Sequence, residues 1–190
     1  MQDEINQYCK ALNDACSSTN WLALNELGQA LIEAWKHGRQ IFLCGNGGSA
    51  ANAVHIANDW VYAVSRQSGN GLRAHALPAN TAVMTCLAND EGYDKVFSIQ
   101  LSVLACPGDI LIVLSGSGNS PNIINALNEA KQLEMTSYAM LGFDGGEARE
   151  LADHSIHFPI NDMQIAEDLQ LISGHILMKF LSKNKDSIRA

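Results

Sequence analysis

The sequence has 190 residues, of which 47% are hydrophobic and 17% are charged, and its formal net charge is −8. This composition is typical of a folded globular chain and excludes an intrinsically disordered one. The acidic balance disfavours a nucleic-acid partner, the polar start MQDEINQYCK is unlike a signal peptide, and no apolar run is long enough to span a membrane.

Two helices are predicted first, over residues 3–16 and 20–37, because apolar residues recur there at helical spacing. Strands and helices then alternate: strand 41–44, helix 49–64, strand 72–77, helices 78–87 and 91–104, strand 109–114, helix 121–133, strand 136–141, helix 144–152, edge strand 154–160 and helix 164–183. Short, continuously apolar strands between helices predict a parallel sheet covered on both faces. We therefore expect a three-layer α/β/α sandwich with five parallel strands. It forms one domain over residues 1–190, with a helical extension (1–38) and an α/β core (39–190).

Small polar residues follow two of the predicted strands, as GNGGSA from Gly45 and as SGSGNS from Ser115. The carboxyl ends of parallel strands are where such sheets bind ligands, and the N-terminus of a following helix favours an anion. Neither loop has a GxGxxG or GK[ST] pattern, and neither contains a lysine or arginine. Each could be a plain turn, with Ser49 or Ser120 as a helix N-cap. Two such loops favour a phosphate or sugar phosphate held by neutral donors.

Histidines and carboxylates recur on two of the predicted helices. His55 and Asp59 are four residues apart and share one helical face, a spacing that suits two metal ligands and equally an exposed pair. On the last helix Asp168 and His175 are seven apart, whereas Glu167 is offset from His175 by roughly 80°. Taken alone, His175 is better explained as a histidine of the core.

The five cysteines are odd in number and form no CxxC pair: Cys9, Cys16, Cys44, Cys86 and Cys106. This usage predicts reduced thiols in a cytoplasmic protein and gives no support to a structural zinc site on cysteine.

Together these features resemble the sugar isomerase (SIS) family, and within it the phosphoheptose isomerases. Those enzymes interconvert sedoheptulose 7-phosphate and D-glycero-D-manno-heptose 7-phosphate. The resemblance covers nearly the whole chain and rests on the two leading helices, a late histidine, and the segments GNGGSAANAVH, LANDEGYDKVF and LSGSGNSPNII. It implies the SIS fold, one Zn²⁺ or other divalent ion per subunit, and a homotetramer with the N-terminal helices between subunits. Alternatively, those helices cover the sheet of their own chain.

The resemblance also implies site residues. Those that would contact the sugar phosphate are Asn46, Gly47, Gly48, Ser49, Asp59, Asn89, Asp90, Ser115, Gly116, Ser117, Ser120 and Glu167. Those that would bind the metal are His55, Asp59, Glu167 and His175.

At two of these positions the chain departs from the family. Asp59 stands where the family has a catalytic glutamate, and Glu167 stands where it has a glutamine ligand. The aspartate carboxylate lies about an ångström further back, and such a displacement can slow a general base on the order of a hundredfold. Two histidines and two carboxylates remain a good ligand set for a divalent ion.

We therefore predict an aldose–ketose isomerase of heptose phosphate that works through an enediol. Asp59 is the expected base, His175 the acid and a metal ligand, and the metal ion the electrophile for the developing oxyanion. Two alternatives stay open: an isomerase or binder of another phosphosugar, and a non-catalytic SIS-fold regulator that binds the bacterial replication initiator. All four candidate ligand positions, His55, Asp59, Glu167 and His175, hold residues that can bind a metal, which favours an enzyme over a non-catalytic scaffold.

Overall fold

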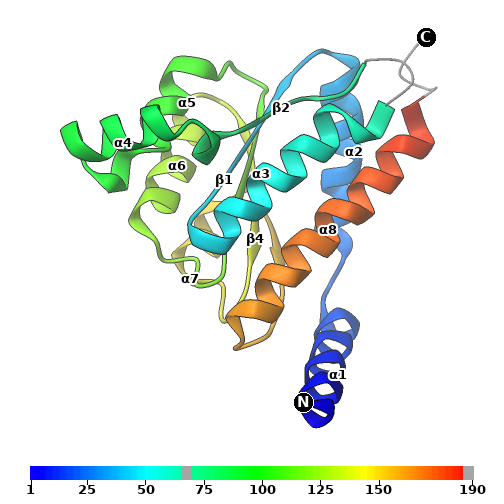
Figure 1. The fold of residues 1–190 in the computed structure, drawn as a ribbon. Helices are drawn as coiled ribbons and strands as arrows, with labels where there is room; N and C mark the ends of the chain where they lie inside the picture. The colour runs from blue at the N-terminus through cyan, green and yellow to red at the C-terminus, as the bar shows by residue number, and fades with distance from the viewer. Residues whose placement is uncertain (66–69, 186–190) are drawn as a thin grey trace.

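A five-stranded, all-parallel sheet forms the centre of the computed structural model, which describes residues 1–65 and 70–185 (Figure 1). The strand order is β2-β1-β3-β4-β5. The strands are β1 (Gln40–Gly45), β2 (Arg73–Ala76), β3 (Ile110–Ser115), β4 (Thr136–Leu141) and β5 (His154–His157). The three middle strands are almost wholly buried, which explains why they read as unbroken apolar runs. The predicted three-layer α/β/α sandwich is confirmed.

Helices cover both faces of the sheet. One face carries α2 (Leu22–Lys36), α3 (Gly47–Val61) and α8 (Met163–Asn184), and the other carries α4 (Thr81–Asp90), α5 (Ser98–Leu104), α6 (Pro121–Gln132) and α7 (Gly146–Leu151). Each face has its own hydrophobic core, with Trp60 as a large buried side chain in the first and Phe97 in the second. Short 3₁₀ helices, η1 (Ala63–Ser65), η2 (Leu77–Ala79) and η3 (Tyr93–Lys95), complete the connections. In the described part of the chain, no helix is long and apolar enough to cross a bilayer.

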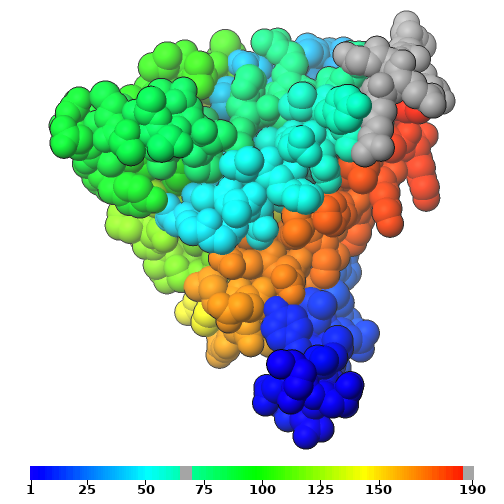
Figure 2. All heavy atoms as spheres, in the orientation of Figure 1, coloured from blue at the N-terminus to red at the C-terminus, as the bar shows by residue number. Residues whose placement is uncertain are grey.

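The two N-terminal helices differ in their packing. Helix α2 belongs to the core, where Leu27 and Leu31 are fully buried against the sheet and α8. Helix α1 (Gln2–Ser18) buries only Ala15 and projects from the body as a separate lobe (Figure 2). Its Tyr8 hydroxyl donates a hydrogen bond to Asp168 of α8 at 2.8 Å. Residues 1–38 therefore comprise one core helix and one projecting helix.

Several predicted elements need correction. The predicted helix 78–87 is divided into η2 and α4 at the N-cap Asn80, and the predicted edge strand 154–160 ends at His157. Residues 91–104, predicted as one helix, form η3 and then α5. No helix begins at residue 91, because Gly92, directly before η3, takes a φ of +102° that a helix does not allow. Helix α3 begins at Gly47, so Asn46 occupies the N-cap position that the sequence suggested for Ser49.

Candidate active site

The two small-residue loops meet at the carboxyl ends of adjacent strands. β1 and β3 pair in parallel with Gly45 opposite Leu114, so the loops that follow them emerge side by side. From these loops α3 crosses to one face of the sheet and α6 to the other, which makes this the topological switch point of the sheet. A cavity of about 250 Å³ lies there, lined by Asn46, Gly47, Gly48, Ser49, Leu114, Ser115, Gly116, Ser117, Ser120, Met163 and Glu167. The structure thus brings all eight predicted loop residues into one cavity.

Close packing explains the glycines of these loops. A Cβ at Gly48 would overlap the Glu167 carboxylate, and a Cβ at Gly116 would overlap the Met163 sulfur. Within the second loop the Ser115 hydroxyl oxygen accepts from the Gly118 amide at 3.0 Å, which leaves its proton free to donate to a ligand. No motif in the sequence singled out Met163, whose side chain reaches the cavity from the first turn of α8.

The electrostatics of the cavity are unusual for an anion site. No lysine or arginine is among its lining residues, and Glu167 adds a carboxylate. The favourable groups are hydroxyls, backbone amides and the positive ends of the α3 and α6 dipoles. Such a site suits a phosphate ester bound through neutral donors.

A second set of polar side chains ties the two loops together. Asn46 Nδ2 donates to Asn122 Oδ1 at 2.9 Å, and Asn122 Nδ2 donates back to Asn46 Oδ1 at 2.8 Å. The Tyr93 hydroxyl donates to the same Asn46 oxygen at 2.9 Å. Sequence reasoning missed Asn122 and Tyr93; the segment SPN, directly after the serine loop, was the one available signal for Asn122.

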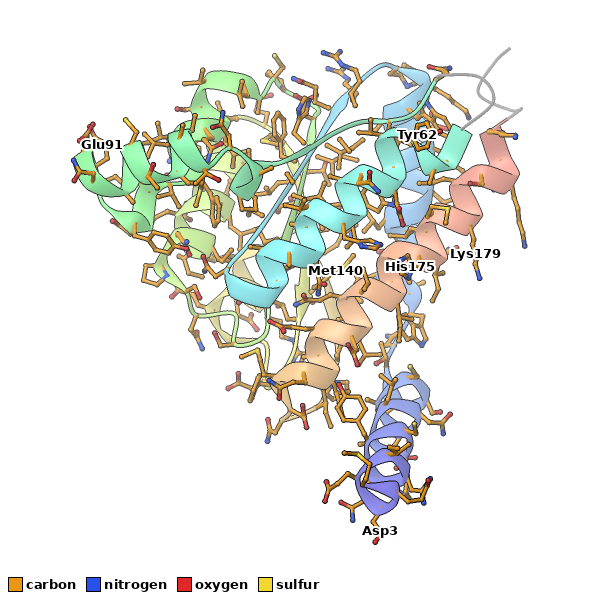
Figure 3. The ribbon with its side chains drawn as sticks, viewed as in Figure 1. Asp3, Tyr62, Glu91, Met140, His175 and Lys179 are labelled. Atoms are coloured by element: carbon orange, nitrogen blue, oxygen red, sulfur yellow. The ribbon has the colours of Figure 1, made fainter. Side chains whose placement is uncertain are left out.

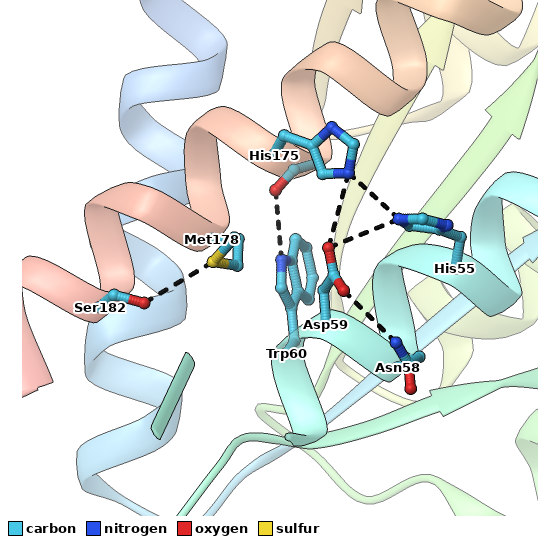
Figure 4. A network of polar contacts seen from close by, with 8 residues as sticks. His55, Asn58, Asp59, Trp60, His175, Met178 and Ser182 are labelled. Atoms are coloured by element: carbon cyan, nitrogen blue, oxygen red, sulfur yellow. Dashed lines mark hydrogen bonds and ion pairs between the residues drawn. The ribbon is translucent and has the colours of Figure 1, made fainter. Parts of the chain in front are cut away.

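Further along α3 and α8, three potential metal ligands converge (Figure 4). His55 Nε2 lies 3.1 Å from His175 Nε2, and Asp59 Oδ2 lies 3.5 Å and 3.6 Å from these two nitrogens. Gly174 permits the close approach of the helices, because its missing Cβ leaves room for Ile56 of α3. The histidine–carboxylate pair on α3 and the late histidine on α8 therefore form one cluster.

This cluster fits a divalent metal ion such as Zn²⁺. Zn–N distances of about 2.0–2.1 Å place two tetrahedral ligands about 3.3 Å apart, close to the three separations seen here. Two imidazoles and one carboxylate leave a fourth position for water or substrate. The other Asp59 oxygen, Oδ1, accepts a hydrogen bond from Asn58 Nδ2 at 3.3 Å, which orients the carboxylate.

Residues 5–142 match the SIS domain family. The phosphoheptose isomerase of Aliarcobacter butzleri is 39% identical over 160 residues, 83% of each chain, and that of Burkholderia pseudomallei is 42% identical over 156 residues, 81% of this chain and 78% of the relative. The chain belongs to the phosphoheptose isomerase family. The solved structure of a phosphoheptose isomerase from Francisella tularensis matches it with a TM-score of 0.86 at 26% identity, covering 96% of this chain and 98% of that one. This membership confirms the predicted enzyme class, an aldose–ketose isomerase of phosphosugars.

Of the predicted sugar-phosphate contacts, Glu167 lines the cavity, whereas Asp59, Asn89 and Asp90 do not, and Asp59 lies in the His55–Asp59–His175 cluster. Glu167 lines the cavity and is not in the metal cluster, because it precedes His175 by eight residues, about 12 Å along α8. Asn89 and Asp90 lie at the exposed end of α4 and bond to each other at 2.7 Å. Figure 3 shows the next residue, Glu91, at the tip of that helix, on the side of the molecule away from His175. Within one chain, the structure supports neither a ligand role for Glu167 nor a cavity contact for the Asn89–Asp90 pair.

Proposed function

We propose that the protein converts sedoheptulose 7-phosphate to D-glycero-D-manno-heptose 7-phosphate, with the phosphate in the loop cavity and the carbonyl end of the sugar at the histidine–aspartate cluster. The observation that carries this proposal is the spacing of the two sites along the seam between α3 and α8. Gly48 and His55 are seven residues apart, about 10 Å along the helix. With carbon–carbon bonds of about 1.5 Å, an extended seven-carbon chain with its phosphate also spans roughly 10 Å.

The cluster supplies the groups that aldose–ketose isomerisation needs. His55, Asp59 and His175 would hold the metal ion, which when bound acts as a Lewis acid toward the oxygen that gains charge. Asp59 Oδ1, the carboxylate oxygen not turned toward the histidines, takes the proton from the carbon beside the carbonyl and returns it to the neighbouring carbon. Because His175 turns Nε2 toward the cluster, its Nδ1 is the nitrogen left to exchange a proton with the sugar oxygens or solvent.

The test is turnover of sedoheptulose 7-phosphate by the purified protein, after chelation and after adding back Zn²⁺. We expect metal-dependent formation of the aldose. Asp59→Asn and His175→Gln should abolish turnover while phosphate binding in the cavity is kept, since both residues lie outside its lining. His37→Gln, which changes an exposed histidine at the end of α2, is the matched control and should stay fully active. Wild-type activity in either site variant would contradict these roles.

We further propose a homotetramer in the cytoplasm. An apolar groove of about 320 Å³ between α2 and α8 is lined by Trp21, Leu24, Asn25, Gly28, Ile176, Leu177 and Phe180. Helix α1 exposes Ile5 and Tyr8, and both the groove and this helix surface are of the kind that subunits bury on association. All five cysteines are unpaired, which agrees with a reducing compartment.

A further inference from the structure

Helix capping differs at the cavity from capping elsewhere in the molecule. Four helices begin after a residue whose side chain usually caps the first turn: α3, α4, α6 and α8, after Asn46, Asn80, Ser120 and Asp162. Asn80 accepts from the Val83 amide and Asp162 from the Ile165 amide, as expected of caps. Asn46 and Ser120, which line the cavity, make no capping bond. At the cavity, therefore, the first-turn amides of α3 and α6 receive no hydrogen bond from their N-cap side chains.

For Asn46 the structure shows what keeps the side chain away from its helix. Its amide oxygen accepts two hydrogen bonds, from Asn122 Nδ2 and from the Tyr93 hydroxyl, and an amide oxygen has two acceptor sites. Its amide nitrogen donates to Asn122 Oδ1. Asn122 is 2% exposed, so its side chain is fixed by packing as well as by this reciprocal pair. No acceptor capacity of Asn46 remains for the first turn of α3.

We propose that Asn122 and Tyr93 are positioning residues that hold Asn46 off the N-terminus of α3, so that the first-turn amides stay available to the substrate phosphate. This inference rests on the proposed function, in which the cavity takes a phosphate. The uncovered amides and the helix dipole replace the lysine or arginine that the cavity lacks. Asn122 and Tyr93 line no part of the cavity and act only through Asn46.

Tyr93→Phe tests the proposal with inorganic phosphate as the probe and calorimetry as the measurement. The change frees one acceptor site on Asn46, which then caps α3 and competes with phosphate. From the usual strength of an N-cap, we expect phosphate binding to weaken about three- to thirtyfold. With sedoheptulose 7-phosphate, KM should rise by a similar factor while kcat holds, because phosphate binding is lost equally in ground and transition states. The melting temperature of the ligand-free protein should not fall.

A second substitution separates positioning from a general structural effect. In an Asn46→Gly background no side chain is left to cap α3, so adding Tyr93→Phe should change phosphate affinity no further. Asn122→Leu should reproduce the effect of Tyr93→Phe, and Tyr62→Phe, at the opposite end of α3, should leave affinity unchanged.

Two results would overturn the proposal: phosphate affinity equal to wild type in Tyr93→Phe, or an effect of Tyr93→Phe that persists without the Asn46 side chain. If Asn122→Leu does not fold, Tyr93→Phe still tests the proposal, because Tyr93 is exposed and its substitution disturbs no core packing. A wild-type protein that binds neither phosphate nor the phosphosugar would overturn the proposed function, and this inference with it.

Discussion

Glu167 is the one charged side chain that lines the cavity in the described part of the chain. Its carboxylate lies against Gly48, at the N-terminus of α3, where an anionic ligand would otherwise find only hydroxyls and amides. The family resemblance marked this position as a departure from a glutamine and gave Glu167 two roles, a sugar-phosphate contact and a metal ligand. In the structure, the added charge lies in the lining of the cavity and outside the His55–Asp59–His175 cluster.

We expect Glu167→Gln to tighten the binding of inorganic phosphate about fivefold, because it removes a repulsion of about 1 kcal/mol between charges roughly 4 Å apart in water. The measurement is calorimetric titration at constant ionic strength, and the gain should shrink as salt is raised. Glu129→Gln, the same change of charge on α6 away from the cavity lining, is the control. Equal or weaker binding by Glu167→Gln would show that the carboxylate does not oppose phosphate.

At the scale of elements, the packing of α3 against α8 determines the geometry of the His55–Asp59–His175 cluster. The two helices run in the same direction and pack closely where Gly174 meets Ile56, next to His175 (Figure 1). A Cβ at Gly174 would lie 2.5 Å from Ile56 Cγ1, and Ile56 is buried. The helix spacing therefore depends on one glycine, in spite of its low helix propensity.

Gly174→Ala should destabilise the protein by about 1–3 kcal/mol, because overpacking at the seam outweighs the gain in helix propensity. It should also weaken Zn²⁺ binding, since His175 moves with its helix. Urea unfolding and metal titration measure the two effects. Gly28→Ala is the matched control, because its Cβ would meet only side-chain atoms of Phe180, at 3.1 Å and 3.3 Å, and of Leu177, at 3.5 Å. A Gly174→Ala variant as stable as wild type would show that α3 and α8 can move apart without lowering the free energy of unfolding.

At the scale of the whole molecule, two apolar surfaces lack a partner within the described chain. One is the groove between α2 and α8, and the other is the face of the projecting helix α1. Ile176 lines the groove with 46% of its surface exposed and directly follows His175. An interface there would border the His55–Asp59–His175 cluster.

If the groove is a subunit interface, Ile176→Glu should shift the protein from a tetramer to smaller species, because an unpaired carboxylate is costly to bury. Light scattering after gel filtration, at micromolar concentration, measures the mass. Gln29→Glu, which adds the same charge to an exposed position of α2, should leave the tetramer intact. A wild-type monomer, or an unchanged mass for Ile176→Glu, would contradict the proposed assembly.

The sequence by itself determined the order and type of most elements, since apolar runs and helical periodicity are local properties of the chain. It also determined the two loops and the His55–Asp59 pair, because their residues are close in sequence. The family resemblance implied that His175 joins the α3 pair and that Glu167 joins the loops, but residue spacing alone left His175 in the core. Only the tertiary structure decided which groups make contact: it brings His175 to the α3 pair, separates Glu167 from them, and places Tyr93 and Asn122 on Asn46. These contacts depend on strand order and on the direction of α8, which residue spacing along the chain does not encode.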